Sequence, residues 1–350
     1  MITEISISEF YTQHPALPLI DVRSPGEYEK GHIPHTVNIP LFSNDERARV
    51  GTVYVQESRD KAMELGYHYV TPKLDWFITE SQKVAGKSAV AVHCWRGGMR
   101  SHAFAEHLHD HGFQEVYVIT GGYKAFRNYV LDFFEQPFQL RVLGGYTGSG
   151  KTLLLKKLQE LGEQVIDLEG IAHHKGSAFG AIGEKVQPSV EQFENNLFEQ
   201  FLQVDLQQPI WLEDESHNIG KVKIPMALFR QIREQTVFFI EIPKAERAQY
   251  LVGDYASYGN DLLSSAIDHI AKRLGGQNVK LAHEYLSENN HYEVAFLALQ
   301  YYDKAYNRGI EHRNPEKVHR LKFTKIDAGK NAQALIKFAQ KYESNKAHTV

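Results

Sequence analysis

The chain has 350 residues, enough for two domains that each bury a core, and 42% of these residues are hydrophobic and 23% charged. The net charge of −4 creates no overall basic field for nucleic acid, so any contact with RNA must come from a local patch. The first residues lack the pattern of a signal peptide, no apolar run approaches the roughly 18 residues of a membrane helix, and a single cysteine excludes an internal disulfide. We therefore expect a cytoplasmic protein without membrane contact.

Apolar and turn-forming segments alternate from the start of the chain. Residues 17–23 predict a short buried strand, and residues 24–31 a turn into a brief helix that glycine ends. Residues 32–40 predict an extended segment bounded by prolines. Residues 44–66 are charged, and their second half is expected to be helical.

A predicted strand over residues 88–93 leads into the only cysteine of the chain, Cys94. Arg96, Arg100 and two glycines follow in the same loop, before a helix. Backbone N–H groups, a helix N-terminus and a guanidinium all favour the thiolate, which is the nucleophilic form of cysteine. The alternative is a buried cysteine that acts as a small hydrophobe. We predict that Cys94 is a nucleophile whose cargo goes to another molecule, because no second cysteine can resolve it.

The next elements complete an alternating pattern of strands and helices. An amphipathic helix around residues 103–108 stops near Gly112, and residues 116–119 predict a strand before Gly121-Gly122-Tyr123. This alternation favours a parallel α/β sheet.

Three motifs in this order resemble the rhodanese domain over residues 17–129. They are Asp-Val-Arg-x-Pro-x-Glu-Tyr with Gly-His-Ile-Pro, the strand–cysteine loop–helix, and Gly-Gly-Tyr. The loop cysteine of that family carries sulfur as a persulfide, so the resemblance implies sulfur or selenium transfer by Cys94. Asp21 and Arg23 are expected to support the loop.

A domain boundary is expected at Pro137, which cannot continue the preceding helix. The predicted domains are residues 1–136 and 137–350. The second opens on a strand at residues 140–143.

That strand leads into a full G-x-x-x-x-G-K-[ST] match. The loop residues expected to bind phosphate are Gly145, Gly148, Ser149, Gly150, Lys151 and Thr152. Backbone N–H groups and the following helix N-terminus would cradle a phosphate chain, Lys151 would reach its terminal phosphates, and Thr152 would hold Mg²⁺. A chance glycine-rich loop is the alternative, which the strand before and the helix after make less favourable.

Further strands are predicted at residues 165–169, 209–213 and 236–242. The acidic run Glu213-Asp214-Glu215 stands at the end of the second of these strands. A P-loop domain usually supplies a carboxylate for its metal at such a strand end. We favour Asp214 for this role, although all three carboxylates could simply solvate the strand end. Residues 170–180, rich in glycine and polar side chains, predict a loop that faces the substrate.

The last part of the chain is helical and aromatic. A tyrosine stripe within residues 261–306 is expected to pack between helices. Residues 308–325 carry six Lys or Arg against two Glu and form a candidate RNA phosphate patch, or a solvated surface. A strand near residues 321–323 and an amphipathic helix over residues 335–342 follow.

The spacing from Cys94 to Arg100, C-x5-R, resembles the loop of cysteine phosphatases, in which arginine binds phosphoryl oxygens. This length favours a donor with an oxyanion, such as selenophosphate. It does not separate a phosphatase from a chalcogen transferase.

The order of the two loops resembles the tRNA 2-selenouridine synthase family over essentially the whole chain. The fold class expected is α/β, with a rhodanese-like parallel-sheet domain followed by a P-loop NTPase-like α/β domain with a helical C-terminal part. The resemblance implies that selenium from selenophosphate replaces the sulfur of wobble 2-thiouridine in tRNA, after S-geranylation from geranyl diphosphate. Cys94 would hold the selenium, and Arg96 and Arg100 the oxyanions of selenophosphate.

Some partners and functions stay open. The P-loop would bind either geranyl diphosphate or a nucleotide, and a selenophosphate-producing enzyme is a candidate partner. The alternatives to the transferase are a cysteine-dependent phosphatase or sulfurtransferase with a regulatory P-loop domain, and a nucleotide-dependent binding module without catalysis.

Overall fold

A computed structural model describes residues 1–347 of the chain. Contacts divide these residues into two compact units. The first consists of Met1–Phe134 with Glu194–Phe198, and the second of Glu135–Phe193 with the described residues from Glu199 onward. The predicted division between residues 136 and 137 lies close to the end of the main segment of the first unit.

The first unit is built on a five-stranded parallel sheet with the order β1-β5-β4-β2-β3. Its strands are β1 (Ile2–Ile5), β2 (Leu19–Asp21), β3 (Val37–Asn38), β4 (Ala89–His93) and β5 (Glu115–Ile119). The predicted parallel sheet is confirmed. The edge strand β1, which pairs with β5, was not predicted, because Ile2-Thr3-Glu4-Ile5 is too short for a clear alternation of apolar and polar residues.

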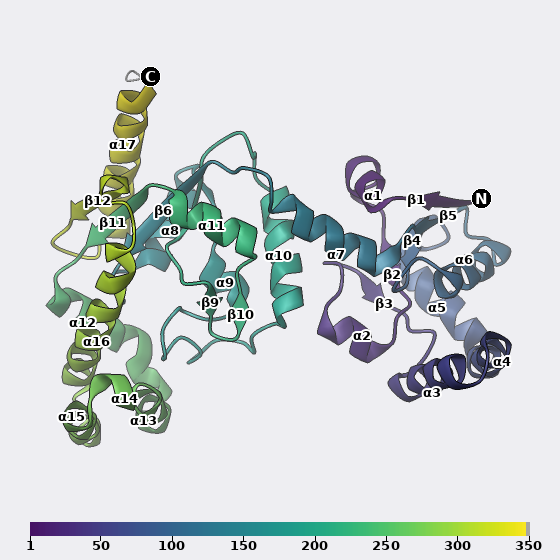
Figure 1. The fold of residues 1–350 in the computed structure, drawn as a ribbon, viewed down its shortest axis with the longest axis horizontal. Coiled ribbons are helices and arrows are strands. Elements are labelled where there is room, and N and C mark those ends of the chain that lie inside the picture. Colours follow the sequence, from purple (N-terminus) through teal and green to yellow (C-terminus); the bar gives the residue numbers. More distant parts are fainter. Residues whose placement is uncertain (348–350) are drawn as a thin grey trace. The chain divides into compact units, whose positions relative to one another are not determined.

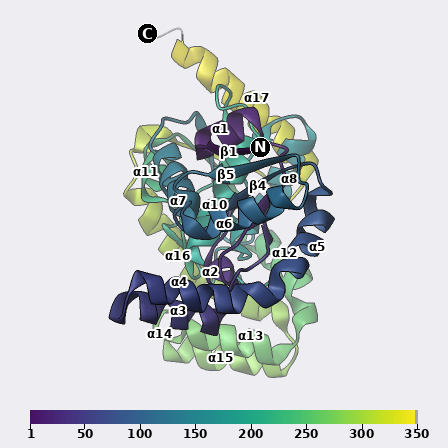
Figure 2. The same ribbon diagram turned by 90° about the vertical axis from the view of Figure 1, so that its right-hand side faces the viewer.

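Helices α1 to α6 lie between these parallel strands along the chain, and α7 follows β5 (Figure 1). They are α1 (Ile7–Gln13), α2 (Pro25–Lys30), α3 (Asn44–Gln56), α4 (Arg59–Val70), α5 (Leu74–Ala85), α6 (Met99–Asp110) and α7 (Gly122–Phe133). α3 and α4 lie side by side in both views of the ribbon (Figures 1 and 2). The core beneath the helices includes Phe77, Phe104 and the strand residues Val90 and Val92, and Cys94 belongs to it.

The second unit has its own five-stranded parallel sheet, with the order β12-β11-β6-β8-β7. Its strands are β6 (Leu140–Gly145), β7 (Gln164–Val165), β8 (Ile210–Glu213), β11 (Val237–Glu241) and β12 (Val318–Lys322). A short antiparallel pair, β9 (Asn218–Ile219) and β10 (Val222–Lys223), follows β8. The sheets of both units confirm the expected α/β class.

The predicted strand over residues 165–169 is wrong beyond Val165. There the chain leaves the sheet, and Asp167 caps the short helix α9 (Leu168–Ala172) by accepting a hydrogen bond from the N–H of Gly170 at 2.7 Å. An aspartate that can bond a backbone N–H three residues ahead favours a helix start over a continued strand.

The helices of the second unit form two groups. Those near the sheet are α8 (Lys151–Glu160), α11 (Met226–Glu234) and α17 (Ala328–Ala347). Helix α10 (Val190–Leu202) is divided: its ends belong to this unit, and its middle, Glu194–Phe198, to the first. The helical C-terminal part consists of α12 (Lys244–Tyr255), α13 (Asn260–His269), α14 (Ala271–Leu274), α15 (Gly276–Ser287) and α16 (His291–Glu311), and has a core of its own. Within residues 1–347, no helix is both long and apolar enough to cross a membrane.

Candidate functional site

Cys94 lies directly after β4, in a loop that ends where α6 begins at Met99. Its side chain is buried, at 3% exposure, and its Sγ lies 3.3 Å from the hydroxyl of Ser101 in the first turn of α6. The parallel sheet thus delivers the sulfur to the carboxyl end of a central strand, beside a helix N-terminus. This is the position in which α/β folds commonly place reactive groups.

Electrostatics around the sulfur favour the thiolate. Burial alone raises the pKa of Cys94, but the Ser101 hydroxyl, the charge of Arg100 and the backbone N–H groups of Arg96 and Ser101 outweigh it, so the pKa lies below its usual value. Hydrogen bonds and positive charge act on the thiolate more strongly than on the neutral thiol. The sulfur is therefore equipped as a nucleophile.

The two loop arginines occupy different positions. Arg96 is exposed and offers its backbone N–H to the sulfur, whereas Arg100 is partly buried and its Nη1 donates to Glu27 at 3.1 Å. Burial raises the pKa of Glu27, but the charge of Arg100 and the N–H of Ser24 lower it by more, so the net pKa is below its usual value. The ionised carboxylate holds the Arg100 guanidinium beside the loop. Glu27 is the glutamate of the Asp-Val-Arg-x-Pro-x-Glu-Tyr motif, and the sequence does not show that its partner is Arg100.

The cysteine loop is locked onto the start of α7 by close backbone contact. The N–H of Tyr123 donates to the carbonyl of Cys94 at 2.9 Å, and the N–H of Lys124 to that of Trp95 at 3.0 Å. A Cβ on Gly122 would lie 2.3 Å from the Cys94 carbonyl oxygen, and a Cβ on Gly97 would lie 2.4 Å from a carbonyl oxygen of β5. Both positions therefore require glycine.

A buried ion pair supports the loop from below. The carboxylate of Asp21, at the end of β2, accepts two hydrogen bonds from the Arg23 guanidinium, at 2.9 Å and 2.6 Å. Arg23 also donates to the carbonyl of Gly31 at 2.8 Å and stacks over the ring of Tyr123, 3.8 Å from its centroid. These contacts tie β2 to the turn after α2 and to α7.

In the second unit, Gly145–Thr152 curls between β6 and α8. Gly148 and Gly150 have φ of +76° and +75°, and the ammonium of Lys151 donates to the carbonyl of Gly145 at 3.0 Å. The buried hydroxyl of Ser149 has no hydrogen-bond partner among the described residues. A glycine-rich turn before a helix N-terminus, with an unsatisfied donor and a lysine, suits a phosphate group.

The loop lies against buried carboxylates. The hydroxyl of Thr152 donates to Glu169 at 3.3 Å, and a Cβ on Gly176 would lie 2.5 Å from an oxygen of Glu169 and 2.9 Å from one of Glu215. Burial raises the pKa of both glutamates. The charge of Asp167 adds to the rise for Glu169, the charge of Glu169 adds to the rise for Glu215, and Lys151 opposes both. A cation beside Thr152 would relieve the repulsion.

These residues fit Mg²⁺ bound together with a substrate phosphate. No group of three or more Asp, Glu, His or Cys within the described part of the chain is arranged to hold a metal by itself. Mg²⁺, however, usually uses one or two carboxylates and completes its shell with phosphate oxygens and water. Thr152 with Glu169 and Glu215 meets that requirement.

Asp214, the carboxylate favoured from the sequence, is committed elsewhere. It forms a short buried ion pair with Arg313, lies 3.5 Å from Arg233, and accepts a hydrogen bond from the hydroxyl of Tyr306 at 3.2 Å. Its role as a metal ligand stays a prediction, and the distances favour Glu169.

The wall of this site includes residues that the sequence had placed in packing. A pocket of about 1200 Å³ is lined by the P-loop, by Lys175–Ala178 of the glycine-rich loop and by aromatic side chains of α16, including Tyr302 and Tyr306. The hydroxyl of Tyr306 also accepts a hydrogen bond from the N–H of Gly145 at 3.3 Å. The (i, i+4) spacing of these two tyrosines shows that they share a helix face, but not that this face meets the P-loop.

Half of the basic side chains of the proposed patch over residues 308–325 have partners within the fold, and the other half, Arg308, Lys322 and Lys325, are exposed. Arg313 is buried against Asp214, Arg320 pairs with Glu241 at 2.7 Å, and Lys317 donates to a backbone carbonyl at 2.6 Å. The reading of Arg313 as a surface contact for RNA is wrong, because its charge neutralises a buried aspartate.

Fold and site define a class: a rhodanese-like domain with a cysteine loop, followed by a P-loop domain. The family model for the rhodanese-like domain matches residues 7–129, and that for the tRNA 2-selenouridine synthase AAA domain matches residues 138–335. Three proteins named tRNA 2-selenouridine synthase are each 36% identical to this chain. The relative from Sulfurovum sp. (strain NBC37-1) aligns over 340 residues, 86% of this chain and 90% of its own. That from Marinobacter nauticus aligns over 341 residues, with the same shares, and that from Hydrogenovibrio crunogenus over 325 residues, 83% and 88%.

The chain therefore belongs to the tRNA 2-selenouridine synthase family and is an enzyme of that family. The expected family and class of enzyme are confirmed.

Proposed function

We propose that this enzyme replaces the sulfur of wobble 2-thiouridine in tRNA with selenium from selenophosphate, in two steps that use the two loops. In the first, the P-loop unit binds the diphosphate of geranyl diphosphate, and the thiocarbonyl sulfur attacks the geranyl carbon while diphosphate leaves. Lys151 and the loop N–H groups would hold the leaving diphosphate, and Thr152 with Glu169 would hold Mg²⁺, which neutralises phosphate charge.

In the second step, selenium replaces the S-geranyl group. Arg96 and Arg100 hold the oxyanions of selenophosphate while the thiolate of Cys94 attacks its phosphorus. A sulfur–phosphorus bond forms, the phosphorus–selenium bond breaks, and selenide leaves with the bonding electrons and attacks C2 of the base; water then releases phosphate from Cys94 and restores the thiolate. At the base, a C2–selenium bond forms, the C2–sulfur bond breaks, and the geranyl thiolate leaves with the bonding electrons. The observation that carries this proposal is the stabilised thiolate of Cys94, set among an arginine and backbone N–H groups suited to an anionic donor. With tRNA as substrate, we place the reaction in the cytoplasm.

The test follows each nucleoside by mass spectrometry after incubation with 2-thiouridine tRNA, geranyl diphosphate and selenophosphate. Wild-type protein should give 2-selenouridine. Cys94→Ser should accumulate the S-geranyl nucleoside, and Lys151→Ala should leave 2-thiouridine unchanged. A wild-type yield of 2-selenouridine from Cys94→Ser would overturn the role of the cysteine, and turnover of an aryl phosphate without any effect of tRNA would favour a phosphatase.

A further inference from the structure

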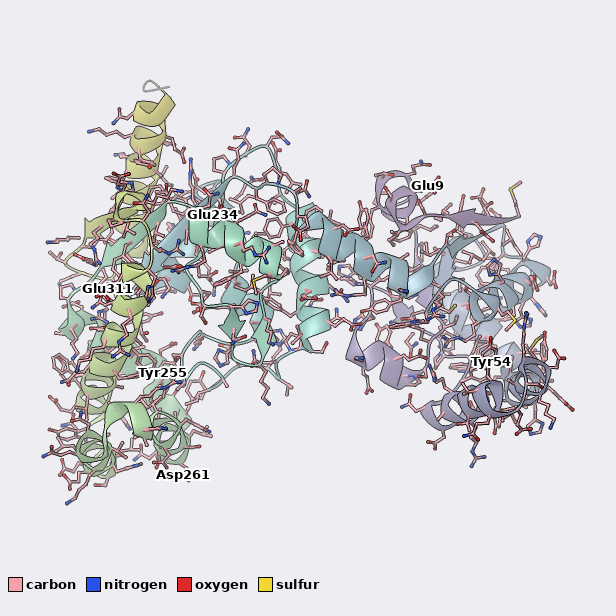
Figure 3. All side chains as sticks on the ribbon, in the orientation of Figure 1. Glu9, Tyr54, Glu234, Tyr255, Asp261 and Glu311 are labelled. Carbon is pink, nitrogen blue, oxygen red and sulfur yellow. The ribbon has the colours of Figure 1, made fainter. Side chains whose placement is uncertain are left out.

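A cavity of about 470 Å³ opens in the first unit among α3, α4, α5 and α6. This volume falls within the roughly 300–1,000 Å³ of small-molecule pockets. Its walls are mainly apolar and include Val50 and Tyr54 of α3, Val70 of α4, Phe77 of α5 and Phe104 of α6. Figure 3 labels Tyr54 on the α3–α4 pair. The cavity is therefore suited to a hydrocarbon group.

Helix α3 is poorly buried for a helix with apolar residues. Along its whole described length, Asn44–Gln56, none of its residues is fully buried. Of the large apolar side chains that remain exposed in this unit, half line the cavity: Tyr54, Val55, Tyr67 and Met99. Clustered exposed apolar side chains commonly mark a binding site, because they leave apolar surface in water.

The cavity reaches the start of α6, which directly follows the cysteine loop. Met99 and Arg100, the first residues of α6 after that loop, line it, and so do Arg47 and Arg59. The Arg59 guanidinium donates to the sulfur of Met99 at 3.3 Å, which joins the start of α4 to the start of α6. An apolar chamber with guanidinium groups at its lining suits a ligand with an apolar chain on a polar, anionic carrier.

We propose that this cavity holds the geranyl chain of S-geranyl-2-thiouridine while the base is positioned at Cys94. The inference rests on the proposed function and names a subsite for its second step. Arg47 and Arg59 would face the phosphates of the tRNA, and the chain would fill the apolar chamber.

The test uses a substitution that fills the cavity without weakening the helix. Gly51 of α3 lines the cavity, and the atom nearest to a Cβ added there is Nη1 of the flexible Arg47 side chain, at 3.2 Å. Gly51→Leu also replaces the poorest non-proline helix former with a good one, so the helix should be retained. Ala48→Leu, at an exposed position of the same helix outside the cavity lining, is the matched control.

Each step is measured separately, with 2-thiouridine tRNA for geranylation and purified S-geranyl tRNA for selenation. Binding of a 2-thiouridine anticodon hairpin is compared with that of its S-geranyl form by fluorescence anisotropy. Wild-type protein and Ala48→Leu should prefer the S-geranyl hairpin by about tenfold or more, because burial of the chain adds affinity. Gly51→Leu should lose that preference, and its ratio of selenation to geranylation should fall about tenfold.

Two outcomes would overturn the inference while the proposed function stands. One is a Gly51→Leu variant with wild-type preference and wild-type selenation. The other is a variant that loses geranylation alone, which would assign the cavity to the donor. If wild-type protein converts neither tRNA, the proposed function itself fails.

Discussion

Removal of the Ser101 hydroxyl should weaken the Cys94 thiolate by an amount that follows from one contact. The two side-chain atoms lie 3.3 Å apart, and this hydrogen bond is the first of the interactions that lower the pKa of Cys94 against its burial. Hydrogen bonds to charged groups contribute about 1.5–3 kcal/mol. At the lower end of this range, about 1.5 kcal/mol, the loss corresponds to about a factor of ten, since one pKa unit is about 1.36 kcal/mol. Ser101→Ala should therefore reduce the thiolate population about tenfold at any pH below the thiol pKa of both wild type and variant.

The assay is alkylation by iodoacetamide, which reports on Cys94 alone because the chain has one cysteine. The rate is followed from pH 5 to 10 in wild type, in Ser101→Ala and in Ser81→Ala, which removes a buried hydroxyl from α5. The Ser101→Ala profile should move to higher pH, with a rate about tenfold lower on the acidic side, and converge with wild type where both thiols are ionised. Superimposed profiles would refute the reasoning.

Three further outcomes are expected. Gly122→Ala should lower the free energy of unfolding in urea by several kcal/mol, because its Cβ would lie 2.3 Å from the Cys94 carbonyl oxygen. The control is Gly86→Ala, which has a similar φ of +61° but whose Cβ would contact nothing within 4 Å; it should cost only about 1–2 kcal/mol. Lys151→Ala should weaken binding of geranyl diphosphate at least about tenfold by calorimetry, and unchanged binding would remove the diphosphate from the P-loop. Burial and then the charge of Asp167 raise the pKa of Glu213 in the folded state. Ionisation of Glu213 therefore costs stability once the pH rises above the pKa of this glutamate in the unfolded chain. Glu213→Gln should raise the urea midpoint of unfolding more at pH 8 than at pH 5, and an equal gain at both pH values would contradict this.

The motifs whose chemistry is local could be predicted from the sequence. Cys94 after a strand, and Gly148, Gly150 and Lys151 between a strand and a helix, are placed as their spacing indicated. A short segment determines its own backbone there, through glycine at turns and apolar runs in strands.

The partners of those motifs could not be predicted, because they come from distant segments. Arg100 meets Glu27 across 73 residues, and Tyr306 meets the N–H of Gly145 across 161. Asp214 stands in a run of three acidic residues that the sequence cannot rank. The guanidinium groups of Arg313, 99 residues away in the chain, and of Arg233 neutralise Asp214 in the folded structure.

The contact between the cysteine loop and α7 has a consequence for transfer of this chemistry to other scaffolds. A Cβ on Gly122 would lie 2.5 Å from the backbone nitrogen of Gly97, so the two segments approach each other too closely for a side chain at either position. The loop from Cys94 to Ser101 therefore does not hold its shape by itself. If this loop alone were grafted between a strand and a helix of another protein, it would lack the backbone contacts that fix its conformation. A functional graft must therefore include the Gly121-Gly122 turn as well.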